Sequence, residues 1–107
     1  MRFEGIWNIC EMEMSDEEYF NTGVQAFIRI NGDGKGEFRF GLVTGDFIGK
    51  IVAQDNSEKF AFKWLGTDEL EPVNGIGWIK IINKDLVAGK FIFCNGEESK
   101  FKVRKID

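Results

Sequence analysis

Residues 24–43 read VQAFIRINGDGKGEFRFGLV, and this stretch decides the fold. On both sides of the central NGDG segment, apolar residues alternate with other residues at a period of two. That period is typical of a β-strand with one buried face. An Asn-Gly-Asp-Gly segment favours the left-handed backbone of a tight hairpin turn. The stretch therefore predicts two paired antiparallel strands, Val24–Ile30 and Glu37–Val43.

The same alternation recurs in six more short runs, which are separated by clusters of Gly, Asn and Asp. These further strands are predicted over Gly5–Met14, Asp46–Ala53, a run holding Phe60–Leu65, Gly75–Ile82, Leu86–Cys94 and Ser99–Ile106. The buried face of the first strand is expected to change partway along. A tight Thr44–Gly45 turn should precede Asp46, and the longest loop should span Gly66–Asn74.

One short helical turn is expected after the first strand. Ser15 and Glu18 have the spacing of a capping box, in which each side chain bonds the backbone of the other.

All remaining connections are short, so consecutive strands should be antiparallel neighbours. Eight such strands most naturally close into an all-β, up-and-down barrel covering residues 1–107 as one domain. Glycines within the strands would serve as bend points, and these are Gly41, Gly49, Gly77 and Gly89. A two-sheet β-sandwich is the alternative.

Composition excludes several functional classes. The net charge of −4 and pI near 4.9 argue against a nucleic-acid surface, which is expected to be basic. Neither a signal peptide nor an apolar run of membrane-spanning length is present, which predicts a cytoplasmic protein without membrane association. Cys10 and Cys94 lie within apolar strand patterns and are expected to be buried, reduced thiols.

The triplet Gly5-Ile6-Trp7 at the start of the first strand, together with Arg104 near the chain end, resembles the arrangement in lipocalins and the wider calycin group. In that arrangement a basic residue of the last strand covers the indole of the first strand and closes one end of the barrel. The resemblance implies that Trp7 and Arg104 close the barrel here.

A second resemblance covers nearly the whole chain and points to a family of small bacterial proteins with no assigned function. The similar stretches are Trp7–Met14, Gly36–Gly41, Phe62–Glu69, Gly75–Trp78 and Gly89–Phe93. Where such proteins are expected to carry His followed by Gly-Asp, this chain has Cys94-Asn95-Gly96-Glu97. The resemblance implies a calycin-like barrel and supplies no activity.

The absence of histidine excludes Ser-His-Asp and Cys-His catalysis and His-rich zinc sites. The Gly-rich segment at residues 32–36 lacks the sequence of a phosphate-binding loop, and Asn31–Gly34 lacks the spaced carboxylates of an EF-hand. We therefore expect no metal and no cofactor.

Barrel topology predicts one charged feature, because the first, third, fifth and seventh connections share a rim. Asp46 borders the third connection. The predicted acidic rim consists of Asp16, Glu17, Glu18, Asp68, Glu69, Glu71, Glu97 and Glu98. Such a rim would attract a cation or a basic protein partner. The same exposed carboxylates would equally keep the protein in solution.

Six aromatic residues are expected either to fill the barrel or to line a cavity for a small apolar ligand, with a filled interior favoured. They are Phe38, Phe40, Phe60, Phe62, Trp64 and Trp78.

The first functional hypothesis is a non-enzymatic binding or interaction module, monomeric or weakly dimeric. A hydrolase-type enzyme using rim carboxylates such as Glu18, Asp68 and Glu97 is the second. A structural or regulatory dimer is the third, suggested by the acidic rim and the basic last strand.

Overall fold

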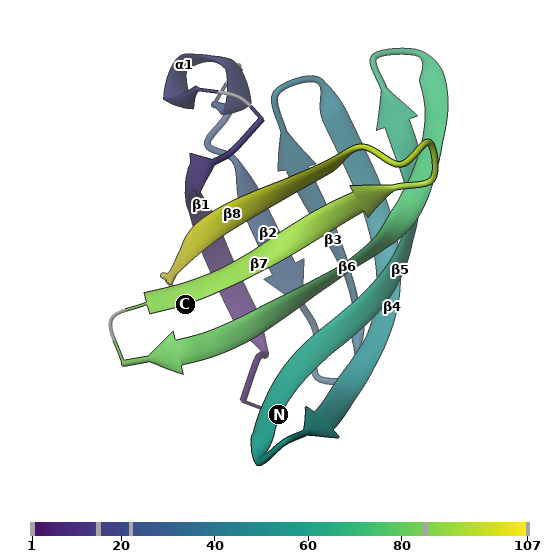
Figure 1. Cartoon of the computed structure of the whole chain (residues 1–107). Helices are drawn as coiled ribbons and strands as arrows, with labels where there is room; N and C mark the ends of the chain where they lie inside the picture. Colours follow the sequence, from purple (N-terminus) through teal and green to yellow (C-terminus); the bar gives the residue numbers. More distant parts are fainter. Residues whose placement is uncertain (1, 15, 22, 85, 107) are drawn as a thin grey trace.

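The structure is a computed structural model that describes residues 2–14, 16–21, 23–84 and 86–106. It is an antiparallel β-barrel with one short helix, α1 (Glu17–Phe20), among the described residues (Figure 1). The strands are β1 (Gly5–Met12), β2 (Phe27–Ile30), β3 (Lys35–Phe40), β4 (Val43–Gln54), β5 (Ser57–Asp68), β6 (Glu71–Asn83), β7 (Leu86–Phe93) and β8 (Glu98–Lys105).

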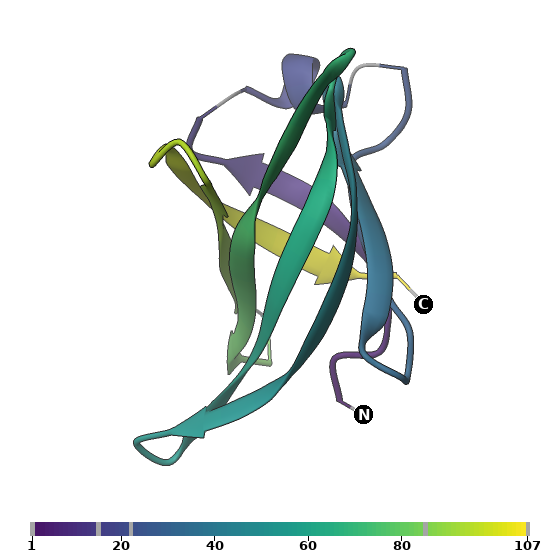
Figure 2. The same ribbon diagram turned by 90° about the vertical axis from the view of Figure 1, so that its right-hand side faces the viewer.

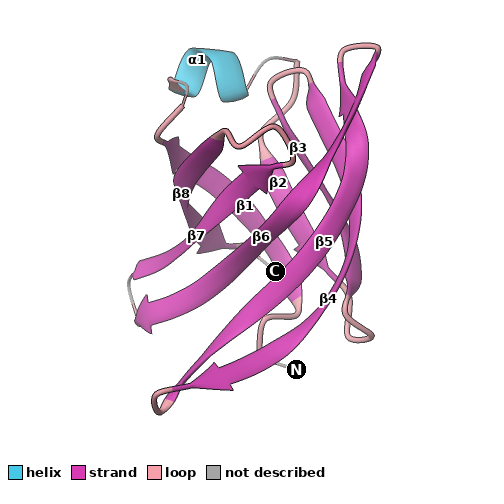
Figure 3. Ribbon diagram, turned by 45° about the vertical axis from the view of Figure 1, so that its right-hand side comes forward, coloured by secondary structure: helices cyan, strands magenta, loops and turns pink. Residues whose placement is uncertain are grey.

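The eight strands follow one another around a closed barrel, and β1 pairs with β8 to complete it. Closure confirms the predicted up-and-down barrel and excludes the sandwich. The β4–β5 hairpin is paired over the whole length of both strands, and it projects beyond the rest of the barrel at one end (Figures 2 and 3). Each strand has two paired neighbours, but β4 pairs with β3 only over residues 43–48, so among the described residues its residues 50–54 have β5 as their one partner strand.

The NGDG turn forms as predicted between β2 and β3. Gly34 N donates to Asn31 O at 3.0 Å, and Gly34 adopts a positive φ of 88°. The boundaries around this hairpin differ from the prediction. β2 begins at Phe27, three residues later than expected, because the side-chain Oδ1 of Asn21 accepts from Ala26 N at 2.8 Å and Val24 is left exposed.

Two predicted connections are wrong in their positions. The β3–β4 turn lies at Gly41–Leu42, so Thr44 and Gly45 belong to β4, and Gly41 is a turn residue with φ of 57°. The expected long loop over residues 66–74 is a hairpin in which β5 pairs with β6 as far as Asp68 opposite Glu71. Pro72 suggested a loop, but it is the second residue of β6, beside the turn, where a strand tolerates proline.

The buried face of β1 changes as predicted, through an irregularity in its pairing with β8 between Ile9 and Glu11. Ile9 and Met12 are buried on either side of it, whereas Cys10 is exposed. Cys94, just beyond β7, is exposed as well. The predicted burial of both thiols is therefore wrong, because the irregularity turns Cys10 outward and β7 ends before Cys94.

Aromatic rings fill the barrel, as the favoured interpretation expected. Phe91 is central, with ring centroids 4.7 Å from Phe38, 4.6 Å from Phe101 and 6.2 Å from Phe62. Five of the six aromatic residues singled out in the sequence are buried, namely Phe38, Phe40, Phe60, Phe62 and Trp64. Trp78 is the exception, because it alternates with the inward positions Gly77 and Ile79 and lies on the outer face.

Strand glycines make room for these rings. Gly77 lies opposite Phe62, and a Cβ on Gly77 would come within 2.6 Å of Phe62 Cζ. Gly89 lies opposite Phe101, and the corresponding distance to Phe101 Cζ would be 2.5 Å. Large rings on one strand therefore pack over glycines on the next, which lets a small barrel hold so many aromatics.

Gly49→Ala is accordingly expected to lower the free energy of unfolding by about 2 kcal/mol. The added Cβ would lie 2.4 Å from the Ala61 carbonyl oxygen and 2.8 Å from Phe62 Cβ, neither of which is a mobile side-chain end. Urea unfolding followed by circular dichroism measures the loss. Gly32→Ala is the control, because its nearest neighbour is the Glu4 carboxylate at 3.1 Å. Equal losses for the two variants would contradict the packing argument.

Candidate functional site

One end of the barrel, which we call the mouth, carries α1 and the turns after β3, β5 and β7 (Figures 1 and 3). This is the arrangement expected from the topology. A cavity of about 360 Å³ lies in the mouth. It is lined by Met14, Tyr19, Phe40, Val43, Asp68, Val73, Phe93, Asn95 and Glu97. We call it the mouth cavity.

The floor of the mouth cavity is formed by rings that also belong to the core. Phe40 stacks on Phe38 with centroids 5.8 Å apart and an interplanar angle of 13°. Phe93 meets Trp64 edge to face at 5.2 Å. These rings separate the cavity from the filled interior. A ligand would therefore occupy the mouth and not the length of the barrel.

The helical segment covers one side of the mouth. Asp16 caps α1 by accepting a bond from Tyr19 N at 3.0 Å, and Phe20 is buried. Phe20 O accepts from Gly41 N at 2.8 Å, which ties the segment to the β3–β4 turn. The Tyr19 ring lies against Gly41, where a Cβ would come within 2.3 Å of it. The helix is thus held in place at a glycine.

Two of the predicted rim acids, Asp68 and Glu97, lie at the mouth cavity. Asp68 ends β5, whereas Glu97 lies in the β7–β8 turn. That turn is ordered by Asn95, whose Oδ1 accepts from Glu97 N at 2.9 Å and whose Nδ2 donates to Glu97 Oε1 at 3.4 Å. The closed barrel therefore brings together two acids that are far apart in sequence. A hydrolase-type enzyme would use the same pair, and that activity stays a prediction.

The other rim acids lie outside the cavity. Asp16 and Glu17 line a groove on the outer wall, and Glu18 is exposed on α1. Glu98 forms an ion pair with Lys90 Nζ at 3.1 Å on the outside of β7 and β8. Of the remaining two, Glu69 lies in the β5–β6 turn and Glu71 is the first residue of β6, and both are exposed.

The opposite end of the barrel places Lys105 beside Trp7. Trp7 is buried, its Nε1 donates to Phe3 O at 2.9 Å, and Lys105 Nζ lies 5.7 Å from the centre of its ring. Arg104 pairs with Asn8 in the β1–β8 ladder, and its side chain is exposed. A basic residue of the last strand thus covers the indole, one position beyond the residue expected from the sequence.

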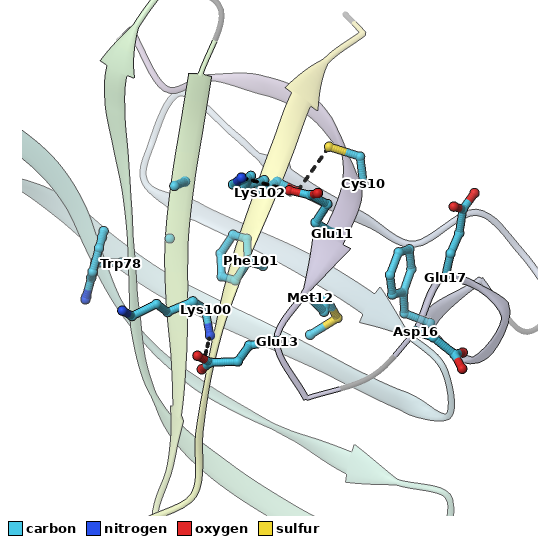
Figure 4. A pocket seen from close by; sticks show the side chains of 13 residues that line it. Cys10, Glu11, Met12, Glu13, Asp16, Glu17, Trp78, Lys100, Phe101 and Lys102 are labelled. Atoms are coloured by element: carbon cyan, nitrogen blue, oxygen red, sulfur yellow. Dashed lines mark hydrogen bonds and ion pairs between the residues drawn. The ribbon is translucent and has the colours of Figure 1, made fainter.

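A second concave feature, the outer groove, has a volume of about 660 Å³ and crosses the outside of β7, β8 and β1 (Figure 4). Trp78 stands at one side of it and Asp16 and Glu17 stand at the other, with Glu13 between them beside Lys100. Lys100 N donates to Glu13 Oε1 at 3.3 Å within the groove lining. Sequence reasoning missed this groove because it placed Trp78 inside the barrel. The alternation of Trp78 with Gly77 and Ile79 was the available signal.

No protein-family model, curated protein or solved structure matches the chain. Among the described residues, no three His, Cys, Asp or Glu side chains are arranged so that they could hold a metal ion. Within the same part of the chain, no helix has the length and apolar character needed to cross a membrane.

Proposed function

We propose that the protein is a non-enzymatic binding module whose mouth holds a small amphipathic cation, that is, an amine attached to an apolar body. The mouth cavity carries this proposal. Its volume of about 360 Å³ falls within the range of small-molecule sites, and its walls include Phe40, Val43 and Phe93. An apolar body would displace water from these walls.

The polar groups at the cavity select the sign of the ligand's charge. Asp68 and Glu97 line it, and no Lys or Arg is found among the described lining residues. Further acids on the same rim, such as Glu69 and Glu71, would add long-range attraction for a cation. The combination of apolar walls and carboxylates therefore favours an alkyl or aryl amine over an anion or a wholly apolar ligand.

Titration calorimetry with 2-phenylethylamine, 2-phenylethanol and phenylacetate tests the proposal, because these probes share a ring and differ in charge. We expect the amine to bind most tightly, the alcohol roughly tenfold more weakly, and the acid not at all. In the variant carrying Asp68→Asn and Glu97→Gln, amine affinity should fall roughly tenfold, whereas alcohol affinity should be unchanged.

Glu18→Gln is the matched control, because it removes an acid from the same rim without altering the cavity lining. It should leave the amine affinity within about twofold of the wild type. Equal affinity for the amine and the acid would overturn the charge assignment. Failure of every probe to bind in the mouth, monitored by shifts of the Phe40 and Phe93 resonances, would overturn the proposed function.

A further inference from the structure

A lysine-rich hollow lies on the outer wall of the barrel, away from the mouth cavity. It is formed by β4, β5 and β6 and has a volume of about 520 Å³. Its lining residues are Ile48, Gly49, Lys50, Lys59, Ala61, Phe62, Lys63, Ile76, Gly77 and Trp78. We call this feature the lysine hollow. It meets the outer groove at Trp78, which lines both.

We propose that the lysine hollow is a docking surface for an acidic segment of a partner protein, one that carries an apolar side chain next to its carboxylates. The lining combines three lysines with exposed apolar residues and contains no Asp or Glu among the described residues. Ile48 of β4 is 57% exposed and Ile76 of β6 is 49% exposed, and the two lie opposite Lys63 on either side of β5.

No Asp or Glu among the described residues forms an ion pair with the lysines of the hollow. Lys90 and Lys102, elsewhere on the outer wall, form ion pairs with Glu98 and Glu11. By contrast, the side chains of Lys50 and Lys63 have no ion pair or hydrogen bond among the residues that the structure describes. Two exposed ammonium groups on a protein whose net charge is −4 thus remain available for an incoming carboxylate.

The contacts of Trp78 favour a peptide over a nucleic acid. Lys59 Nζ already lies 5.6 Å from the centre of the Trp78 ring, so a base could stack on that face of the ring only by displacing the ammonium group. A carboxylate can pair with Lys59 in its present position. An apolar side chain of the same peptide can pack beside Trp78, Ile48 and Ala61.

The closed sheet also restricts how such a partner binds. At the hollow, residues 60–63 of β5 and residues 76–78 of β6 are paired on both sides, whereas β4 pairs with β3 only as far as Ile48. A docking segment that lies over these residues of β5 and β6 therefore cannot add a strand there, and its affinity must come from side chains. Binding of this kind should be moderate in strength and sensitive to salt.

The test uses a dye-labelled peptide of alternating Glu and Leu, with fluorescence anisotropy as the binding measurement. Intrinsic fluorescence reports on the site, because Trp78 is partly exposed whereas Trp7 and Trp64 are 3% and 2% exposed. We expect saturable binding, a blue shift of the emission, and roughly tenfold weakening when the salt concentration is raised from about 0.05 M to about 0.5 M.

The variant carrying Lys50→Gln and Lys63→Gln should weaken peptide binding roughly tenfold while leaving the unfolding midpoint unchanged. Lys84→Gln, which removes one charge at the far end of β6, is the control and should have no effect on binding. A second control, Lys84→Gln with Lys80→Gln, removes two charges, as the test variant does. Lys80 lies on β6 outside the hollow lining.

Three outcomes would overturn the proposal. The first is a peptide affinity that the Lys50 and Lys63 substitutions do not change. The second is tighter, lysine-dependent binding of a thymidine oligonucleotide or of phosphatidylserine vesicles, which would assign the surface to nucleic acid or to lipid. The third is salt-sensitive self-association in sedimentation that the same two substitutions abolish, which would make the occupant the acidic rim of a second copy.

Discussion

Phe91→Ala is expected to lower the free energy of unfolding by about 4 kcal/mol. Phe91 is fully buried, and its ring lies within 6.4 Å, centroid to centroid, of those of Phe38, Phe40, Trp64 and Phe101. Removing it would leave a large cavity in the middle of the barrel. Rings held by three other strands could not all move to fill that space.

Urea unfolding, followed by tryptophan fluorescence and circular dichroism, measures this loss. Phe91→Leu is the matched variant, because leucine keeps much of the buried volume and should cost about half as much. Should Phe91→Ala prove too unstable to purify, the leucine variant still tests the argument. A loss below about 1 kcal/mol for the alanine variant would contradict the central role of this ring.

The fold was predictable because its decisive signals are local. The alternation in Phe38 and Phe40 fixes which face of β3 is buried, and the turn at Asn31–Gly34 fixes the β2–β3 register. Short connections between such strands leave few topologies other than a meander. Closure follows, because an eight-stranded meander can pair its first strand with its last.

The errors arose where local signals favoured one conformation and tertiary contacts another. Pro72 and its neighbours have the composition of a loop, yet pairing with β5 extends β6 through them. Thr44–Gly45 looked like a turn, but Gly45 is a strand residue opposite Phe38, where its missing side chain gives the ring space. Such a glycine cannot be distinguished from a turn glycine until its cross-strand neighbour is known.

The mouth was predictable in outline and not in detail. Topology alone placed the acids on one rim, but it could not show that Asp68 and Glu97 line a cavity while Glu98 pairs outward with Lys90. That distinction depends on whether the side chain at the end of each strand points toward the cavity or toward the outer wall. The lysine hollow was missed for the same reason, since it becomes visible only once Trp78 is assigned to the outer face.

The attachment of the helix to the mouth depends on Gly41. Gly41→Val is expected to lower the free energy of unfolding by about 3 kcal/mol. Gly41 has a φ of 57°, which a β-branched residue adopts only with strain, and its added side chain would collide with the Tyr19 ring. Both effects act where α1 meets the β3–β4 turn, so the helix should detach before the barrel unfolds.

Gly41→Asn separates the two causes, because asparagine tolerates a positive φ but still carries a Cβ. Adding Tyr19→Ala to Gly41→Asn should restore most of the stability, whereas adding it to Gly41→Val should restore only the part due to the collision. Hydrogen exchange at the Gly41 amide, which donates to Phe20 O, reports directly on the attachment. Undiminished protection of that amide in Gly41→Val would show that the helix is held by other contacts. Faster exchange together with weaker amine binding would tie the helix to the proposed ligand site, because Tyr19 lines the same cavity as Asp68 and Glu97.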